Sequence, residues 1–142
     1  MDIPETYIKM CDCPEIQRQW NPQLGDIVFS RNKVKVVLGL TPHYLNDIIG
    51  FWQAIWLPRQ DQLQEMVFPE DPFWRHIDEF HDFAFQRQTL GVMPHYCAIK
   101  EADEQERYVM QFKSMEQLWL AFVMHELHGK KWDGEKWVKE RG

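Results

Sequence analysis

The chain has 142 residues and a net charge of −6, with 44% hydrophobic and 27% charged residues. A chain of this length can bury a core without a disulfide or structural metal, so we predict one globular domain spanning residues 1–142. The negative charge excludes a broad phosphate-binding surface, which requires clustered Lys and Arg, and we expect no nucleic-acid partner.

The chain carries no signal for export or for membrane insertion. Residues 1–10 lack the basic flank and the apolar run of a signal peptide. The longest apolar run, Leu118 to Met124, is far shorter than the ~18 residues of a membrane span. We therefore expect a cytoplasmic protein with no membrane partner, whose cysteines are reduced thiols without CxxC spacing: Cys11, Cys13 and Cys97.

The first third of the chain predicts a helix followed by a hairpin. Asp2 and Glu5 form a capping-box pattern at the start of a helix, which Pro14 interrupts or restarts. Residues 26–30 and 33–38 are rich in β-branched residues around the polar pair Arg31-Asn32. These two segments are predicted to be the strands of a hairpin.

The middle of the chain predicts a strand and two helices. The aromatic run 51–57 is a predicted third strand that ends before Pro58. Residues 60–67 have helical apolar spacing, and Asp71-Pro72 is a typical helix start, so a second helix is predicted from Pro72 to about Gln88.

The last third predicts two strands, an apolar helix and a second hairpin. The strands are predicted at 95–100 and 107–112, around an acidic loop at 101–106. Ser114 and Gln117 begin a helix that is apolar on nearly all sides, runs to His128 and ends at Gly129. Finally, Asp133-Gly134 predicts a two-residue hairpin turn with Trp132 and Trp137 on one face.

Together these elements predict an α+β fold. We expect a small, mostly antiparallel sheet packed on the central helix 114–128, with two or three further helices. The side chains of Trp119, Leu120 and Phe122 should be buried, because the apolar residues of this helix cover more of its circumference than one contact face needs.

Three segments resemble small proteins of unknown function encoded in bacterial prophages. The resemblance lies in residues 56–66 (WLPRQDQLQEM), residues 114–124 (SMEQLWLAFVM) and Trp132-Asp133-Gly134. It implies a prophage setting and carries no catalytic motif or site residue. It leads us to expect an accessory protein that acts through contact with a phage or host protein.

Two groups of polar residues suggest a metal-dependent enzyme as an alternative. Asp78, His81 and Asp82 share one side of their predicted helix, and His125 and Glu126 lie near the end of the apolar helix. Imidazole and carboxylate groups suit zinc, manganese or iron. Neither group has a diagnostic spacing, however, and solvated polar faces of amphipathic helices are the simpler interpretation.

Other motifs give no catalytic assignment. His95 and Cys97 would point to opposite faces of a strand, which argues against a cysteine nucleophile with an adjacent base. No glycine-rich phosphate loop or nucleophile elbow is present, and we expect no cofactor. The aromatic face of Trp132 and Trp137 suggests a carbohydrate-binding module as a further alternative, although packing of the hairpin over the core is the simpler interpretation.

Overall fold

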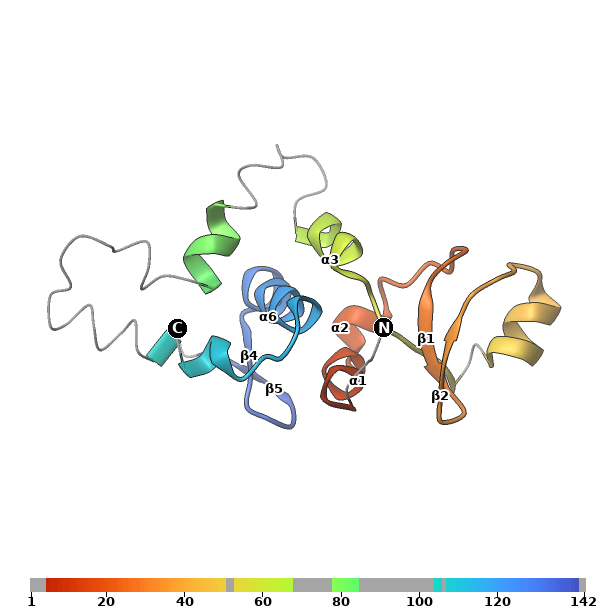
Figure 1. Ribbon diagram of the computed structural model, residues 1–142, viewed down its shortest axis with the longest axis horizontal. Helices are drawn as coiled ribbons and strands as arrows, with labels where there is room; N and C mark the ends of the chain where they lie inside the picture. The colour runs from red at the N-terminus through yellow and green to blue at the C-terminus, as the bar shows by residue number, and fades with distance from the viewer. Residues whose placement is uncertain (1–4, 51–52, 68–77, 85–103, 106, 141–142) are drawn as a thin grey trace, which may run out of the picture. The chain divides into compact units, whose positions relative to one another are not determined.

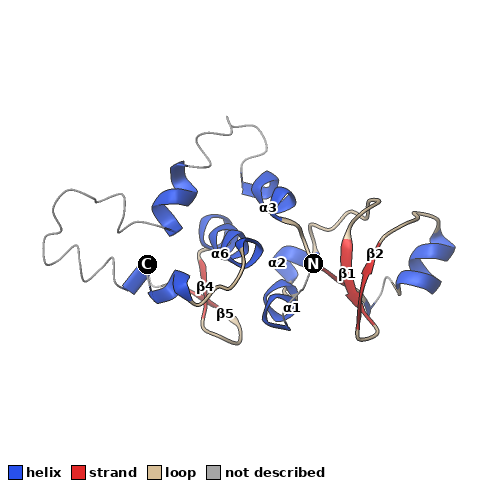
Figure 2. Ribbon diagram, in the orientation of Figure 1, coloured by secondary structure: helices blue, strands red, loops and turns tan. Residues whose placement is uncertain are grey.

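The computed structural model shows an α+β protein in which helices accompany two antiparallel sheets (Figures 1 and 2). The predicted fold class is therefore confirmed. The structure describes residues 5–50, 53–67, 78–84, 104–105 and 107–140. Contacts divide the chain into two compact units, Met1–Arg59 with Lys130–Gly142 and Gln60–Gly129. Among the described residues, no helix combines the length and apolar composition that crossing a bilayer requires.

The first unit begins with two short helices, α1 (Glu5–Cys11) and α2 (Pro14–Gln17). Between them Cys13 is extended, with a φ of −144°, and Pro14 occupies the first turn of α2. Proline lacks an N–H and disfavours helix in the preceding residue, so it ends one helix and can begin the next. Of the two predicted alternatives at this proline, a kink or a restart, the structure shows a restart.

A hairpin follows, made of β1 (Ile27–Ser30) and β2 (Lys33–Val36). The connecting residues Arg31 and Asn32 have φ values of 53° and 63°. Positive φ at both central positions matches the twist of the flanking strands, which explains the tight turn. The hairpin is confirmed, although β2 ends at Val36 and the prediction extended to Leu38.

The predicted third strand is present but short. It is β3 (Ile55–Trp56), which pairs antiparallel with β1 and gives the strand order β2-β1-β3. Gln53 instead forms a tight turn, in which its N–H donates to the Gly50 carbonyl at 2.9 Å. The prediction of a strand over 51–57 was therefore too long.

Helix η1 (Tyr44–Ile49) was not predicted from the sequence. It has π-helical hydrogen bonding and ends at Gly50, whose φ of 71° favours glycine. Its Ile49 side chain packs with Val28 and Val37 in the core of this unit. Helix η1 therefore covers the face of the sheet that carries Val28 and Val37.

The last strands of the first unit are β4 (Lys130–Trp132) and β5 (Trp137–Lys139). They form the predicted hairpin, but Trp132 pairs directly with Trp137, so the connection has four residues and the prediction of two was wrong. The reason is Asp133, whose carboxylate accepts hydrogen bonds from the N–H groups of Glu135 and Lys136 and closes a wider turn.

The second unit contains α3 (Gln60–Val67), which has the predicted bounds, and α6 (Met115–His128). Residues 78–84 are helical, in agreement with the helix predicted from Pro72 to about Gln88, and the rest of that range lies outside the described residues. The predicted strand at 95–100 also lies outside them.

The predicted strand at 107–112 was wrong, because residues 107–110 are helical. Tyr108 and Phe112 are one helical turn apart, and their rings meet edge to face at 5.2 Å. Tyr108 also contacts Phe83, with ring centroids 6.3 Å apart. Helical spacing of the aromatic residues therefore outweighs the strand preference of the local sequence. Residues 104–105, predicted to be loop, are helical as well.

Both ends of α6 carry the predicted signals. The Ser114 hydroxyl accepts a hydrogen bond from the Gln117 N–H at 3.1 Å, and Gly129 ends the helix with a φ of 59°. The Gln117 side chain accepts from the N–H of Lys113, one residue earlier than a capping box requires. Trp119, Leu120 and Phe122 are all buried, as predicted. The Trp119 ring stacks on Phe80 with centroids 3.9 Å apart.

Candidate functional site

The second unit holds a pocket of about 460 Å³. Its lining brings together three of the predicted metal-site residues, Asp82, His125 and Glu126. The other two, Asp78 and His81, are exposed and do not line it. The remaining lining residues are Glu79, Phe83 and Gln105.

The side chains of this pocket are held by local packing. The Gln105 side chain donates to the Phe83 carbonyl at 2.7 Å, and the Phe83 and His125 rings lie 5.3 Å apart. His125 Nε2 is 3.7 Å from Glu126 Oε1. Within the described ranges, no three His, Cys, Asp or Glu side chains are arranged to hold a metal ion. The geometry of the pocket therefore gives the metal hypothesis no support.

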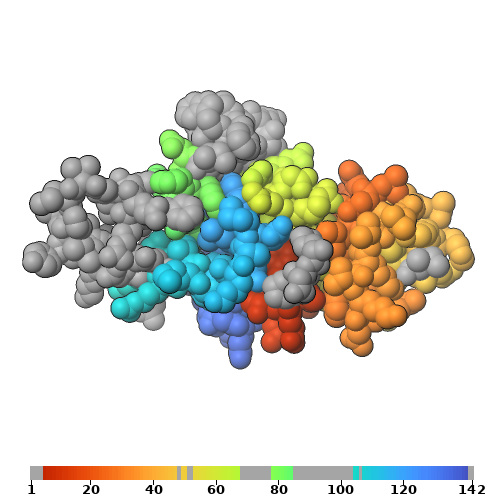
Figure 3. Space-filling view, in the orientation of Figure 1, coloured from red at the N-terminus to blue at the C-terminus, as the bar shows by residue number. Residues whose placement is uncertain are grey.

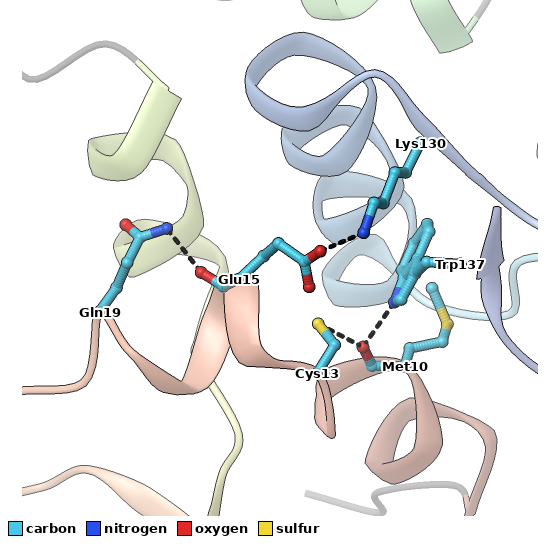
Figure 4. Close-up of polar contacts among 6 residues, drawn as sticks. All are labelled: Met10, Cys13, Glu15, Gln19, Lys130 and Trp137. Atoms are coloured by element: carbon cyan, nitrogen blue, oxygen red, sulfur yellow. Dashed lines mark hydrogen bonds and ion pairs between the residues drawn. The ribbon is translucent and has the colours of Figure 1, made fainter. Parts of the chain in front are cut away.

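Cys11 and Cys13 lie in the first unit as free thiols, Cys11 buried and Cys13 partly buried. Burial raises the pKa of Cys11 well above its ordinary value and that of Cys13 to about 11. The Cys13 thiol donates to the Met10 carbonyl (Figure 4). Since the thiolate is the reactive form, neither residue is set up as a nucleophile. Cys97 and His95 lie outside the described residues.

The aromatic pair of the second hairpin packs against the N-terminal helices. The Trp132 and Trp137 rings lie 5.0 Å apart, and Trp137 Nε1 donates to the Met10 carbonyl at 2.9 Å (Figure 4). Trp132 is only 3% exposed. A sugar needs an open ring face for stacking, which the buried Trp132 does not offer, so these contacts favour packing of the hairpin, and the carbohydrate hypothesis stays a prediction.

The three-stranded sheet has one apolar face that is incompletely covered. Because side chains alternate along a strand, the pairs Ile27↔Val36, Phe29↔Val34 and Phe29↔Ile55 place their side chains on the same face. Val34 and Val36 are 46% and 47% exposed. We call the residues of this surface the apolar sheet face: Ile27, Phe29, Val34, Val36 and Ile55. In Figure 3 the orange segment that contains β1 and β2 forms a continuous area of surface.

The two edges of this sheet differ. At the β3 edge, Trp56 donates to Gln17 Oε1 at 2.9 Å and its carbonyl accepts from Gln17 Nε2 at 3.0 Å. At the β2 edge, Tyr44 is the one side chain among the described residues that bonds the outward backbone groups: its hydroxyl accepts from the Leu38 N–H at 3.0 Å and lies 3.5 Å from the Val36 carbonyl. The backbone groups at the β3 edge are therefore bonded by Gln17. Those at the β2 edge are bonded by Tyr44 only near Val36 and Leu38.

The β2 edge is also the most basic part of an otherwise acidic chain. Residues 27–46 contain Arg31, Lys33 and Lys35 and no Asp or Glu. The first acidic residue after them is Asp47, which pairs with His43 at 2.7 Å. Basic residues therefore alternate with the exposed Val34 and Val36 along this edge.

Sequence reasoning did not identify this surface, although its signal is present. Residues 33–36 read Lys-Val-Lys-Val, which is the alternation of a strand with one polar and one apolar face. That pattern normally turns the apolar side to the core. The core side of β2 is instead set by Val37, which is fully buried, so Val34 and Val36 face outward.

No family model, curated protein or solved structure matches this chain. The resemblance to prophage-encoded proteins therefore stays a prediction, and the case for a function rests on the surface described above.

Proposed function

We propose that this chain is an accessory protein that acts through protein-protein contact, and that the apolar sheet face is its contact surface. The observation that carries the proposal is the shared orientation of Phe29, Val34 and Val36 on a face where both valines are nearly half exposed. Exposed apolar area of this kind costs ~25 cal/mol per Å² in water, and covering it by a partner recovers that free energy.

The surroundings of the face favour a protein partner with negative charge. Protein interfaces combine apolar and polar groups, and here Lys33 and Lys35 alternate with Val34 and Val36 along the edge strand, with Arg31 in the adjoining turn. Leu38 extends the apolar area beyond the strand and is 76% exposed. The proposed partner is therefore a second, acidic protein.

The resemblance of residues 56–66 and 114–124 to prophage-encoded proteins implies the same kind of function, an accessory protein that contacts a phage or host protein. The gene neighbourhood separates the options. Capsid or tail genes on both sides would favour a role in assembly, whereas replication or lysogeny genes would favour regulation.

Site-specific photo-crosslinking tests the contact surface. A photoreactive amino acid is placed at Val36 in the full chain, expressed at its native level in its native cells. The matched control is Met110, an exposed apolar residue of the second unit that is 67% exposed. We expect a discrete protein adduct from position 36 and none from position 110. Equal adducts at both positions, or none at Val36 with or without prophage induction, would refute the proposal.

A further inference from the structure

We infer that the outer edge of β2 takes an extended acidic segment of the partner as an added strand. This inference rests on the proposed function and specifies how the contact is made. Strand addition to a sheet edge supplies affinity through backbone hydrogen bonds and selectivity through alternate side chains.

The backbone groups of β2 define the open part of this edge. The Val37 N–H donates to the Asp26 carbonyl at 2.8 Å. Because every second residue of a strand directs its backbone groups to the same side, the backbone groups of Lys35 and Lys33 also point toward β1. The backbone groups of Val34 and Val36 point away from β1, as the Tyr44 hydroxyl near the Val36 carbonyl confirms. In the described part of the chain, no residue bonds the N–H groups of Val34 and Val36 or the carbonyl of Val34.

The Tyr44 hydroxyl marks where an added strand ends. It accepts from the Leu38 N–H, so the outer edge beyond Val36 is already engaged. An incoming segment therefore pairs along Lys33–Val36. At the opposite edge of the sheet, Gln17 bonds both backbone groups of Trp56, which directs strand addition to β2 alone.

The side chains of β2 specify the sequence pattern of the partner. Residues directly opposite on neighbouring strands share a face, and opposite charges there stabilise the pair. Apolar residues of the partner would lie beside Val34 and Val36, and an acidic residue beside Lys33, which is exposed. The partner segment is therefore expected to alternate apolar and acidic residues.

A second copy of this chain is a poor occupant of the same edge. Two β2 strands related by a two-fold axis would place Lys33 and Lys35 beside the equivalent lysines of the other copy. Like charges at opposite positions destabilise a strand pair, and edge lysines are a common protection against self-association. The exposed Lys33, which opposes a homodimer, favours an acidic partner.

Titration of the full-length protein with designed peptides tests this inference. The probe is a capped, fluorescently labelled peptide of about eight residues in which Glu and Val alternate. One control alternates Lys and Val, and a second alternates Glu and Pro, which keeps the charge but cannot donate backbone hydrogen bonds from the proline positions. We expect the Glu-Val peptide to bind at pH 7 and low salt, and each control to bind at least about tenfold more weakly.

Variants of β2 separate edge pairing from general attraction. Val34→Pro removes an outward N–H without removing a bond to β1, and Val34→Thr keeps that N–H as the matched control. We expect loss of binding for V34P and near-native binding for V34T. The double variant Lys33→Glu/Lys35→Glu should weaken binding of the Glu-Val peptide at least about tenfold and strengthen binding of the Lys-Val peptide. If V34P fails to fold by circular dichroism, the charge-reversed variant decides the test.

Each result has a defined meaning. No binding of the Glu-Val peptide, together with a crosslink at Val36, would overturn strand addition and leave the protein-contact proposal standing. Native binding to a folded V34P variant, or equal binding of the Glu-Pro peptide, would also overturn it. Equal binding of the Lys-Val peptide would overturn the inference that the partner segment is acidic. Self-association of the protein that the peptide competes away would overturn it as well.

Discussion

The side-chain amide of Gln17 hydrogen-bonds both backbone groups of Trp56, accepting from its N–H at 2.9 Å and donating to its carbonyl at 3.0 Å. The same Gln17 Nε2 also donates to the Cys11 carbonyl at 2.8 Å. A single side chain thus takes the place of a neighbouring strand at the β3 edge and joins that edge to the N-terminal helices.

Gln17→Ala is expected to destabilise the protein by about 1–3 kcal/mol, because it leaves partly buried backbone groups without partners. Gln19→Ala is the control, since Gln19 is exposed and bonds only within its own segment, to the Glu15 carbonyl. Its expected effect lies within about 0.5 kcal/mol. Urea unfolding of both variants measures the difference. Equal effects would contradict the assigned role of Gln17.

Trp119→Ala is expected to cost about 3–5 kcal/mol through lost burial and a cavity. Trp119 is 1% exposed and stacks on Phe80. Leu127→Ala on the same helix should cost less than about 1 kcal/mol, because Leu127 is 43% exposed. Equilibrium urea unfolding compares the two, and a mild effect of W119A would refute the central position of α6 in its unit.

The ion pair between Lys130 and Glu15 predicts a stability that depends on pH (Figure 4). The hydrogen bond from Lys130 lowers the pKa of Glu15. Since the folded pKa lies below the unfolded one, the pair stabilises the fold at neutral pH, and this contribution is lost as pH falls through the folded pKa. Lys130→Met should therefore destabilise at pH 7 and have little effect in acid. Lys139→Met, at an exposed position, should show no such trend in thermal unfolding measured from pH 7 to pH 2.

Cys13 is expected to react slowly with iodoacetamide. Its pKa is raised from 9.0 to about 11, chiefly by burial, so about a hundredfold less thiolate is present at pH 8 than in an ordinary cysteine. Site-resolved mass spectrometry follows the rate in folded and urea-unfolded protein. Between pH 9 and 10 the folded rate should still rise about tenfold while the unfolded rate levels off. Parallel pH profiles would contradict the raised pKa.

Much of the fold could be predicted because several elements carry local signals. Pro14, the Arg31-Asn32 turn and the Ser114 cap each determine structure within a few residues. The second hairpin was assigned a connection two residues too short, yet both Trp residues were placed on one face. An even shift in register preserves the alternation of side chains, which explains that result.

The errors came from segments whose structure depends on distant contacts. Tyr108 favours a strand by local preference but is held in a helix by packing on Phe83. Helix η1 has only six residues, too few for its apolar spacing to identify it, and its Ile49 packs on Val28 and Val37. The apolar sheet face was missed for a related reason, since only the tertiary structure shows which side of β2 the core covers.

Backbone amide hydrogen exchange of the full-length protein, with and without the Glu-Val peptide, tests the central claim most directly. In the free protein, the N–H groups of Val34 and Val36 should exchange quickly, while that of Lys35, directed to β1, is protected. Addition of the peptide should slow exchange at Val34 and Val36 at least about tenfold and leave Lys35 unchanged. Unchanged exchange at both valines with the peptide bound, or equal slowing at all three residues, would contradict strand addition at the β2 edge.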